Sequence, residues 1–185
     1  KYSSVDGVLY SKDGTELITY PRGKKDVSFT VPSSVTKIQK YCFEGCQYLE
    51  TVELPKTNIQ LEYEAFRYCA SLKYITIPST VTSLGSNLFK DCTALESITF
   101  EKGSSITGIP QSFATGCTSL KSINIPDTVL YISERAFENC SSLGSISLPS
   151  KVKSIGSDAF SGCSSLKSFV IPDAVTVITN GVFSG

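Results

Sequence analysis

Apolar residues recur along most of the chain in one pattern, which is clearest between Cys140 and Cys163. In this stretch Ile146 and Leu148 alternate with serines, and a period of two is typical of a β-strand with one buried face. Pro149 follows at once and ends the predicted strand, because proline has no N–H to donate to a strand ladder.

The second half of the stretch has a different spacing. Val152 and Ile155 lie three residues apart, which predicts a short, kinked extended segment on the opposite face. Ser157–Gly162 then carries a small apolar residue and a phenylalanine, and we expect it to form a single helical turn closed by a glycine in left-handed geometry.

The same unit repeats with a fixed length. Six leucines, each three residues after a cysteine, mark six coils: Leu49, Leu72, Leu95, Leu120, Leu143 and Leu166. Phenylalanines keep the same interval, 23 or 24 residues, at 43, 66, 89, 113, 137, 160 and 183. This period is typical of leucine-rich repeat solenoids, in which one coil cannot bury its apolar face alone. We predict a right-handed solenoid, α/β leaning to mostly β, with short parallel strands and a phenylalanine column.

Residues 1–31 lack this pattern. Val8–Tyr10 and Leu17–Tyr20 flank Lys12–Gly14, a turn signal that predicts a β-hairpin. We therefore expect an N-terminal hairpin cap over residues 1–31 and a solenoid of about six repeats over residues 32–185, together forming one domain. The chain lacks an initial Met and stops one residue before the next expected cysteine, so we expect it to be a segment of a longer protein.

Composition excludes several classes of function. Among 185 residues, 17 basic and 17 acidic side chains leave no net charge to attract nucleic acid or an anionic membrane. No apolar run approaches the length that would insert into a bilayer. The chain has no histidine, no P-loop and no GxGxxG, so no Ser-His-Asp or Cys-His pair can form. We expect no enzymatic activity and no cofactor.

Seven cysteines raise the question of disulfides or metal binding. Six of them occupy one position of the repeat, at 46, 69, 92, 117, 140 and 163. Cys42 is assigned to a small-residue position held elsewhere by Ala65, Leu88, Ser112, Ala136, Ala159 and Val182. Stacked cysteines with parallel side chains fit disulfide geometry poorly, and without histidine or a CxxC pair zinc is unsupported. We predict buried free thiols.

The run Cys-x2-Leu-x2-Ile-x-Ile-Pro-x2-Val-x2-Ile-Gly-x3-Ala-Phe-x2-Cys resembles the BspA-like class of leucine-rich repeats, and Asp6–Pro21 resembles the hairpin that often precedes them. This resemblance implies a secreted or cell-surface protein of a host-associated microbe, with adhesion to host matrix proteins such as fibronectin or fibrinogen. It implies no catalytic residue. Phe100–Glu101 departs from the pattern, where Ile-Pro is expected.

Outward positions of the predicted strands are mostly serine and threonine. Beside them Glu50, Lys73, Glu96 and Lys121 alternate in sign, which predicts structural ion pairs between neighbouring coils. These positions carry little sign of a specific ligand.

Aromatic residues give the sharper signal for a binding site. Tyrosines gather in the first two repeats, at Tyr41, Tyr48, Tyr63, Tyr68 and Tyr74, with Arg67 beside Tyr68. Tyr68 occupies a position that other coils fill with residues tolerant of left-handed geometry, namely Gly45, Asp91, Gly116, Asn139 and Gly162. Exposed tyrosine and arginine are typical of binding hot spots. The competing interpretation is that these tyrosines only cover the shoulder of the solenoid.

The sequence therefore predicts a monomeric, extracellular or cell-surface module that binds a protein partner, such as a host matrix protein, through these six residues. Two alternatives stay open, a passive spacer in a larger surface protein and a domain attached to an enzyme. A second candidate site is Glu101–Gly116, where two one-residue insertions break the period.

Overall fold

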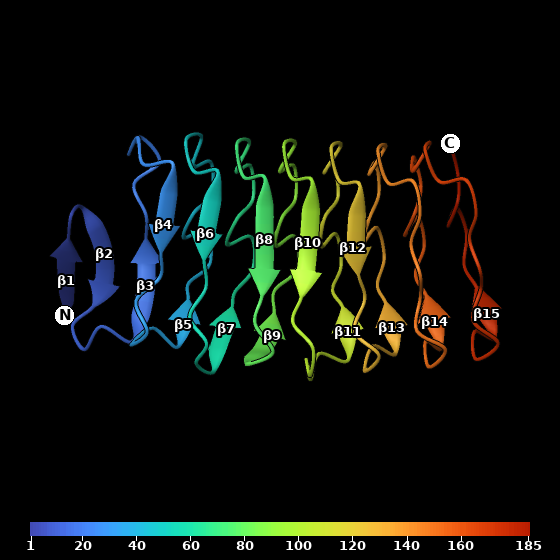
Figure 1. Cartoon of the computed structure of the whole chain (residues 1–185), viewed down its shortest axis with the longest axis horizontal. Coiled ribbons are helices and arrows are strands. Elements are labelled where there is room, and N and C mark those ends of the chain that lie inside the picture. The colour runs from blue at the N-terminus through green and yellow to red at the C-terminus, as the bar shows by residue number, and fades with distance from the viewer.

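The computed structural model describes all residues from 1 to 185 and is a β-solenoid of about seven turns (Figure 1). It contains fifteen short strands and no helix: β1 (Tyr2–Val5), β2 (Val8–Ser11), β3 (Glu16–Thr19), β4 (Ser28–Thr30), β5 (Lys37–Ile38), β6 (Thr51–Glu53), β7 (Ile59–Leu61), β8 (Tyr74–Ile77), β9 (Val81–Leu84), β10 (Ser97–Phe100), β11 (Gly108–Ile109), β12 (Ser122–Asn124), β13 (Tyr131–Ile132), β14 (Ser154–Ile155) and β15 (Val177–Ile178). The predicted stack of short parallel strands is confirmed.

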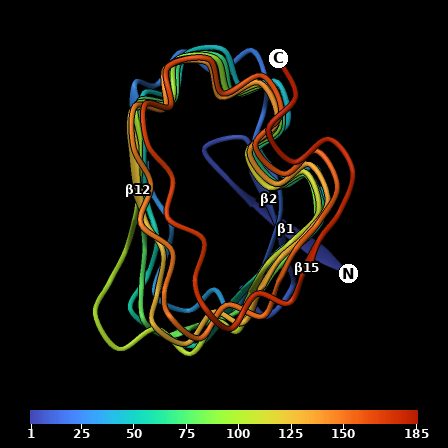
Figure 2. The ribbon, with the colours of Figure 1, turned by 90° about the vertical axis from the view of Figure 1, so that its right-hand side faces the viewer.

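The strands form three sheets along the stack. One five-stranded sheet, here called the front sheet, has the order β12-β10-β8-β6-β4 with parallel neighbours. The opposite side of each coil carries a six-stranded sheet, β1-β2-β3-β5-β7-β9, and a four-stranded sheet, β11-β13-β14-β15. Figure 2, which looks along the stack, shows β12 on one side and β15 on the other.

At the N-terminus, β1 pairs antiparallel with β2, and β2 pairs antiparallel with β3. β3 then runs parallel to β5, so the first strands join the same sheet as the later coils. β4 likewise pairs with β6 in register, Phe29 beside Val52. The division of the chain at residues 31 and 32 stays a prediction.

The interior is one continuous cluster of 49 buried residues, so the chain has a single core from end to end. Phenylalanine rings form its column: Phe43 stacks on Phe66 with centroids 4.9 Å apart, and Phe137 stacks on Phe160 at 5.4 Å. Each fully buried ring of this kind stabilises the fold by about 1.5–3 kcal/mol.

The predicted assignment of the fourth repeat is wrong by one residue. The N–H of Phe89 donates to the carbonyl of Phe113, whereas the N–H of Phe66 donates to Leu88, so Phe113 occupies the small-residue position that had been assigned to Ser112. Ala114 takes the phenylalanine position and bonds to Ala136. The Phe113 ring still reaches the column edge-on, 5.3 Å from Phe89.

The predicted helical turn is also wrong, because this segment is a series of tight turns. In Ser157–Gly162 successive N–H groups have acceptors in different coils. The N–H of Ala159 donates to the carbonyl of Gly156, three residues back, whereas the N–H of Phe160 donates to the carbonyl of Val182 in the next coil. In a helix both N–H groups would donate to carbonyls of the same coil, a few residues back. Asp158 within the segment has a φ value of 56°, which also excludes a right-handed helix, whereas the predicted left-handed glycine at its end is confirmed, because Gly162 has a φ value of 70°.

Candidate binding surfaces

Every coil reverses direction at two left-handed residues, five and one before the ladder cysteine. Most coils place glycine, asparagine, aspartate or another polar residue there, but coil one has Tyr41 with φ 61° and coil two has Tyr68 with φ 59°. Left-handed geometry costs about 1–2 kcal/mol for a residue with a Cβ. Both tyrosines are about two-fifths exposed, so part of each ring stays open to solvent.

Tyr41 and Tyr63 come from adjacent coils and their rings meet edge-on, with centroids 5.8 Å apart. A main-chain bond of 3.3 Å from the Tyr41 N–H to the Tyr63 carbonyl fixes their spacing. Hydrogen bonding to the carboxylate of Glu64 raises the pKa of the Tyr63 hydroxyl. The pair therefore presents two half-exposed rings on a rigid backbone.

Arg67 links this pair to Tyr68. Its guanidinium donates to Glu64 at 2.7 Å and to the Tyr68 hydroxyl at 2.7 Å, and it lies 4.4 Å from the Tyr68 ring centroid. Glu64 is only 4% exposed, so the arginine neutralises a buried carboxylate and its own pKa is raised. We call Tyr41, Tyr63, Arg67 and Tyr68 the tyrosine shoulder.

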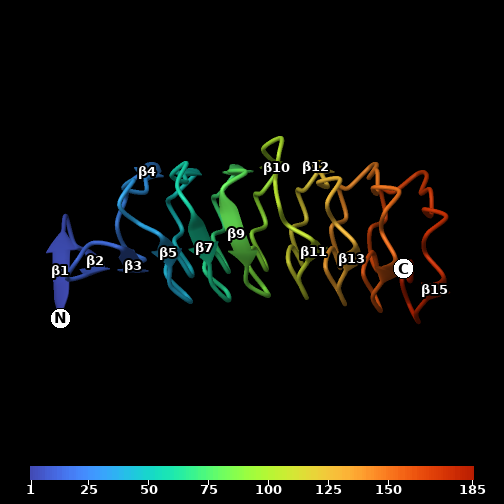
Figure 3. The ribbon, with the colours of Figure 1, turned by 90° about the horizontal axis from the view of Figure 1, so that it is seen from below.

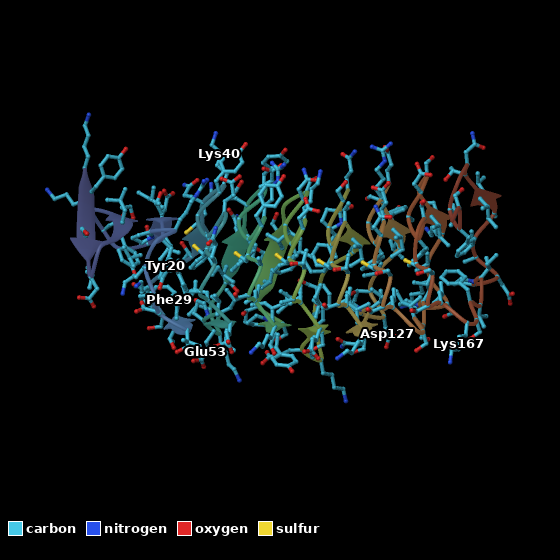
Figure 4. All side chains as sticks on the ribbon, turned by 90° about the horizontal axis from the view of Figure 1, so that it is seen from above. Tyr20, Phe29, Lys40, Glu53, Asp127 and Lys167 are labelled. Atoms are coloured by element: carbon cyan, nitrogen blue, oxygen red, sulfur yellow. The ribbon has the colours of Figure 1, made fainter.

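The remaining predicted residues lie elsewhere. Tyr74 is half exposed on β8, next to Thr51 of β6. Figure 4 shows Lys40, the neighbour of Tyr41, and Glu53 of β6 projecting from opposite sides of the molecule. Tyr48 is exposed in the segment that leads from the turns to the front sheet. No hydrogen bond, ion pair or ring contact joins Tyr48 or Tyr74 to Tyr41, Tyr63, Arg67 or Tyr68.

Front-sheet side chains form the expected small polar surface with ion pairs at its edge. Lys73 bonds to Glu50 and Lys121 bonds to Glu96, both at 2.7 Å. An interaction that the sequence did not reveal joins Lys56 and Glu101, whose charged atoms are 3.5 Å apart. These residues are 45 positions apart in sequence, so only the position of Glu101 in the irregular segment hinted at a special role.

All seven cysteines are buried and free. Each ladder thiol from Cys69 onward donates to a main-chain carbonyl of the preceding coil, for example Cys92 Sγ to the Phe66 oxygen at 3.0 Å. Burial raises the pKa of these thiols, to about 12 for Cys46 and about 11 for Cys163. They are therefore protonated and serve packing rather than nucleophilic chemistry.

The described side chains bring together no group of three or more metal-ligating residues. None of the chain's segments forms a helix that is long and apolar enough to cross a bilayer. What the surfaces offer is recognition chemistry: exposed aromatic rings, one preorganised guanidinium and rows of hydroxyl groups.

Parallel strands stacked at a 23-residue period, with a leucine in each coil and a proline and a phenylalanine at fixed places in most coils, define a leucine-rich repeat solenoid. The family described as BspA type leucine rich repeat region matches residues 23–113 and 107–185, with six copies of its repeat. The chain belongs to this family. Comparison with curated proteins gives no match.

Solved structures agree with this assignment. A leucine-rich repeat protein from Eubacterium ventriosum is 32% identical with a TM-score of 0.92, over 100% of this chain and 49% of that one. A leucine rich cell surface protein from Faecalibacterium prausnitzii is 34% identical with a TM-score of 0.62, over 90% and 38%. A leucine rich repeat protein of T. pallidum, 23% identical with a TM-score of 0.71 over 100% and 96%, shows the fold alone. The chain spans about half or less of the first two proteins.

Proposed function

We propose that the chain is a non-enzymatic binding module of a secreted or cell-surface protein, which binds a protein partner through the tyrosine shoulder and so mediates adhesion to host matrix or cell surfaces. Membership of a leucine-rich repeat family whose repeats generally bind proteins supports the class of function. The similarity to a cell surface protein of Faecalibacterium prausnitzii supports the location.

The strained exposure of Tyr41 and Tyr68 carries this proposal. Left-handed geometry belongs to this turn in every coil, but only coils one and two place a tyrosine in it, and residues held in this geometry cluster at functional sites. The neighbouring Arg67 loses little conformational freedom on binding, because Glu64 and Tyr68 already fix it. Aromatic and arginine side chains preorganised in this way are typical of binding hot spots.

The test separates binding from folding at Tyr68. Tyr68→Gly removes the ring and relieves the backbone strain, so the thermal midpoint should stay within a few degrees of the parent chain. Binding to immobilised fibronectin and fibrinogen, measured by surface plasmon resonance, should weaken by about tenfold or more, as for a hot-spot residue. Tyr131→Ala, which removes a tyrosine of equal exposure outside the shoulder, is the matched control.

Undiminished binding by Tyr68→Gly and by a Tyr41→Ala, Tyr63→Ala double variant would move the binding site away from the shoulder. The small polar side chains of the front sheet favour a second candidate function, a passive spacer that holds another domain off a surface. A spacer would bind neither protein and would tolerate all of these substitutions.

A further inference from the structure

Tyr74 is the only aromatic side chain that points outward from the front-sheet strands. Its neighbours in the ladder are Thr51 and Ser97, and the next outward residue of its own strand is Thr76. Half of the Tyr74 side chain is exposed, so a ligand can reach a face of the ring.

A hollow of about 330 Å³ lies beside this ring. Its polar lining comes from Thr51, Glu53, Lys56, Thr76 and Glu101, with Pro78 as an apolar wall. The Lys56–Glu101 ion pair closes it at the end of the strands, and Glu101 also accepts a hydrogen bond from the Ser79 N–H at 3.3 Å. The size is within the range of small-ligand sites.

The wall containing Glu101 exists because the chain bulges there. Figures 2 and 3 show a yellow-green loop, following β10, that projects beyond the other coils. The Thr128 hydroxyl anchors it by donating to the carbonyls of Ser104 and Ile106, at 3.1 and 2.6 Å. The Asn124 side chain accepts a hydrogen bond from the Phe100 N–H and donates one to the Phe100 carbonyl, both at 2.8 Å. The bulge is therefore fixed at its base.

The charged side chains of the hollow are Glu53, Lys56 and Glu101, which together carry one negative charge. Glu101 faces Lys56, and Glu53 accepts a hydrogen bond from Thr30 at 3.1 Å. The hollow thus combines hydrogen-bond donors and acceptors with an accessible aromatic ring. This lining suits a ligand without a strong charge. A sugar ring has the matching chemistry, an apolar face of C–H groups and a rim of hydroxyls that both donate and accept.

We propose that this hollow binds a neutral sugar residue, with the C–H face of the sugar against Tyr74 and its hydroxyls held by Glu101, Lys56 and the threonines. The lining of this site contains none of the shoulder residues, and the proposal does not depend on protein binding there. A surface protein with both would recognise a protein and a glycan through separate faces.

The experiment titrates the 185-residue chain with glucose, galactose, mannose and N-acetylglucosamine, followed by amide NMR shifts. At least one sugar should bind with a dissociation constant in the millimolar range, moving the amides of Tyr74–Pro78 and Glu101. Tyr74→Ala should weaken binding by about threefold to tenfold, as expected for loss of one ring contact, while Tyr74→Phe keeps the ring and should bind nearly as well.

Tyr68→Gly and Tyr131→Ala are the controls that should leave sugar binding unchanged, so failure of the shoulder proposal is separable from failure of this one. The proposal is overturned if no sugar moves these amides, or if Tyr74→Ala binds as tightly as the parent. It is also overturned if free arginine binds the hollow more tightly than every sugar, because the hollow would then be a cation site.

Discussion

The first five front-sheet segments and the last two are built from the same repeat but pair differently. β4 to β12 form an unbroken parallel ladder, whereas Ser145–Leu148 and Ser168–Ile171 lie at the same coil position and form no strand. The coil from Cys140 to Cys163 follows the repeat most faithfully, yet its front segment is irregular. Core residues of the repeat thus specify stacking without specifying a strand.

Outward side chains distinguish β6, β8 and β10 from Ser145–Leu148, although β12 is paired with Ser122 and Asn124 outward. The paired segments carry threonine and tyrosine, which favour strands, at Thr51, Tyr74, Thr76 and Thr99. Ser145–Leu148 carries two outward serines, with Gly144 directly before it, whereas Ser168–Ile171 carries Ser168 and Val170. On the opposite side both coils keep their pairing, through β13, β14 and β15. A β-solenoid coil can therefore be held in the stack by one sheet and by the main-chain hydrogen bonds between the turns of successive coils.

The largest expected effect comes from comparing a ring inside the phenylalanine column with the ring at its C-terminal end. Phe66 is fully buried between Phe43 and Phe89, while Phe183 is 44% exposed. Phe66→Ala should lower the free energy of unfolding by about 3–5 kcal/mol, and Phe183→Ala by about 1 kcal/mol or less. Urea denaturation measures both, and equal losses would show that the column is not the source of stability.

Hydrogen exchange tests the difference between the two regions directly. Amides of β8 and β10 have strand partners and should be protected at least about 1000-fold relative to the unfolded chain, because they open only with the core. Amides of Ser145–Leu148 should exchange far faster. Mass spectrometry of peptides covering the two regions gives the comparison, and equal protection would mean that both are paired in solution.

Alkaline pH should destabilise the whole stack. Burial raises the pKa of the ladder thiols above the ordinary 9.0, so the unfolded chain releases protons that the folded chain retains. This contribution to stability is complete below pH 9 and is lost as pH rises toward the folded values, about 11 for Cys163 and about 12 for Cys46. The urea midpoint should fall above pH 9, and less steeply in Cys163→Ala.

The smallest effect tests the role of the outward residues. Ser145→Thr and Ser147→Thr together should raise the free energy of unfolding by a few tenths of a kcal/mol, up to about 1 kcal/mol, and slow exchange in Ser145–Leu148. The same exchange of serine for threonine at Ser164, which lies outside the strand position, is the control. If both variants behave alike, strand preference does not explain the irregular front.

Much of this architecture was predictable, because the period of the core residues is visible in a single sequence. The phenylalanine column, the buried thiols and the parallel strands follow from it. The exchange of Phe113 and Ala114 was not predictable from the phenylalanine spacing alone, although Phe113 lies four residues before Cys117 where the other coils have three. Nor was the turn geometry at Asp158, because spacing alone cannot tell whether an N–H bonds within its coil or to the next.

The proposed binding surfaces were predictable as residue types, but their positions on the molecule were not. Tyr41 and Tyr74 are both tyrosines at positions that most other coils fill with small, polar or charged residues. Tyr41 lies in the turns, however, and Tyr74 lies on the front sheet. Their separation depends on which side of the coil each position faces. The hollow beside Tyr74 needs Lys56 and Glu101, and only the fold brings these two charges together.

The hydrogen bonds between thiols and carbonyls make each cysteine a reporter of local unfolding. Each thiol bridges a single pair of neighbouring coils, for example Cys140 with the coil that contains Ala114. A thiol becomes accessible to an alkylating reagent only when its own pair separates. The order in which the cysteines are labelled would therefore map, coil by coil, where along the solenoid unwinding begins.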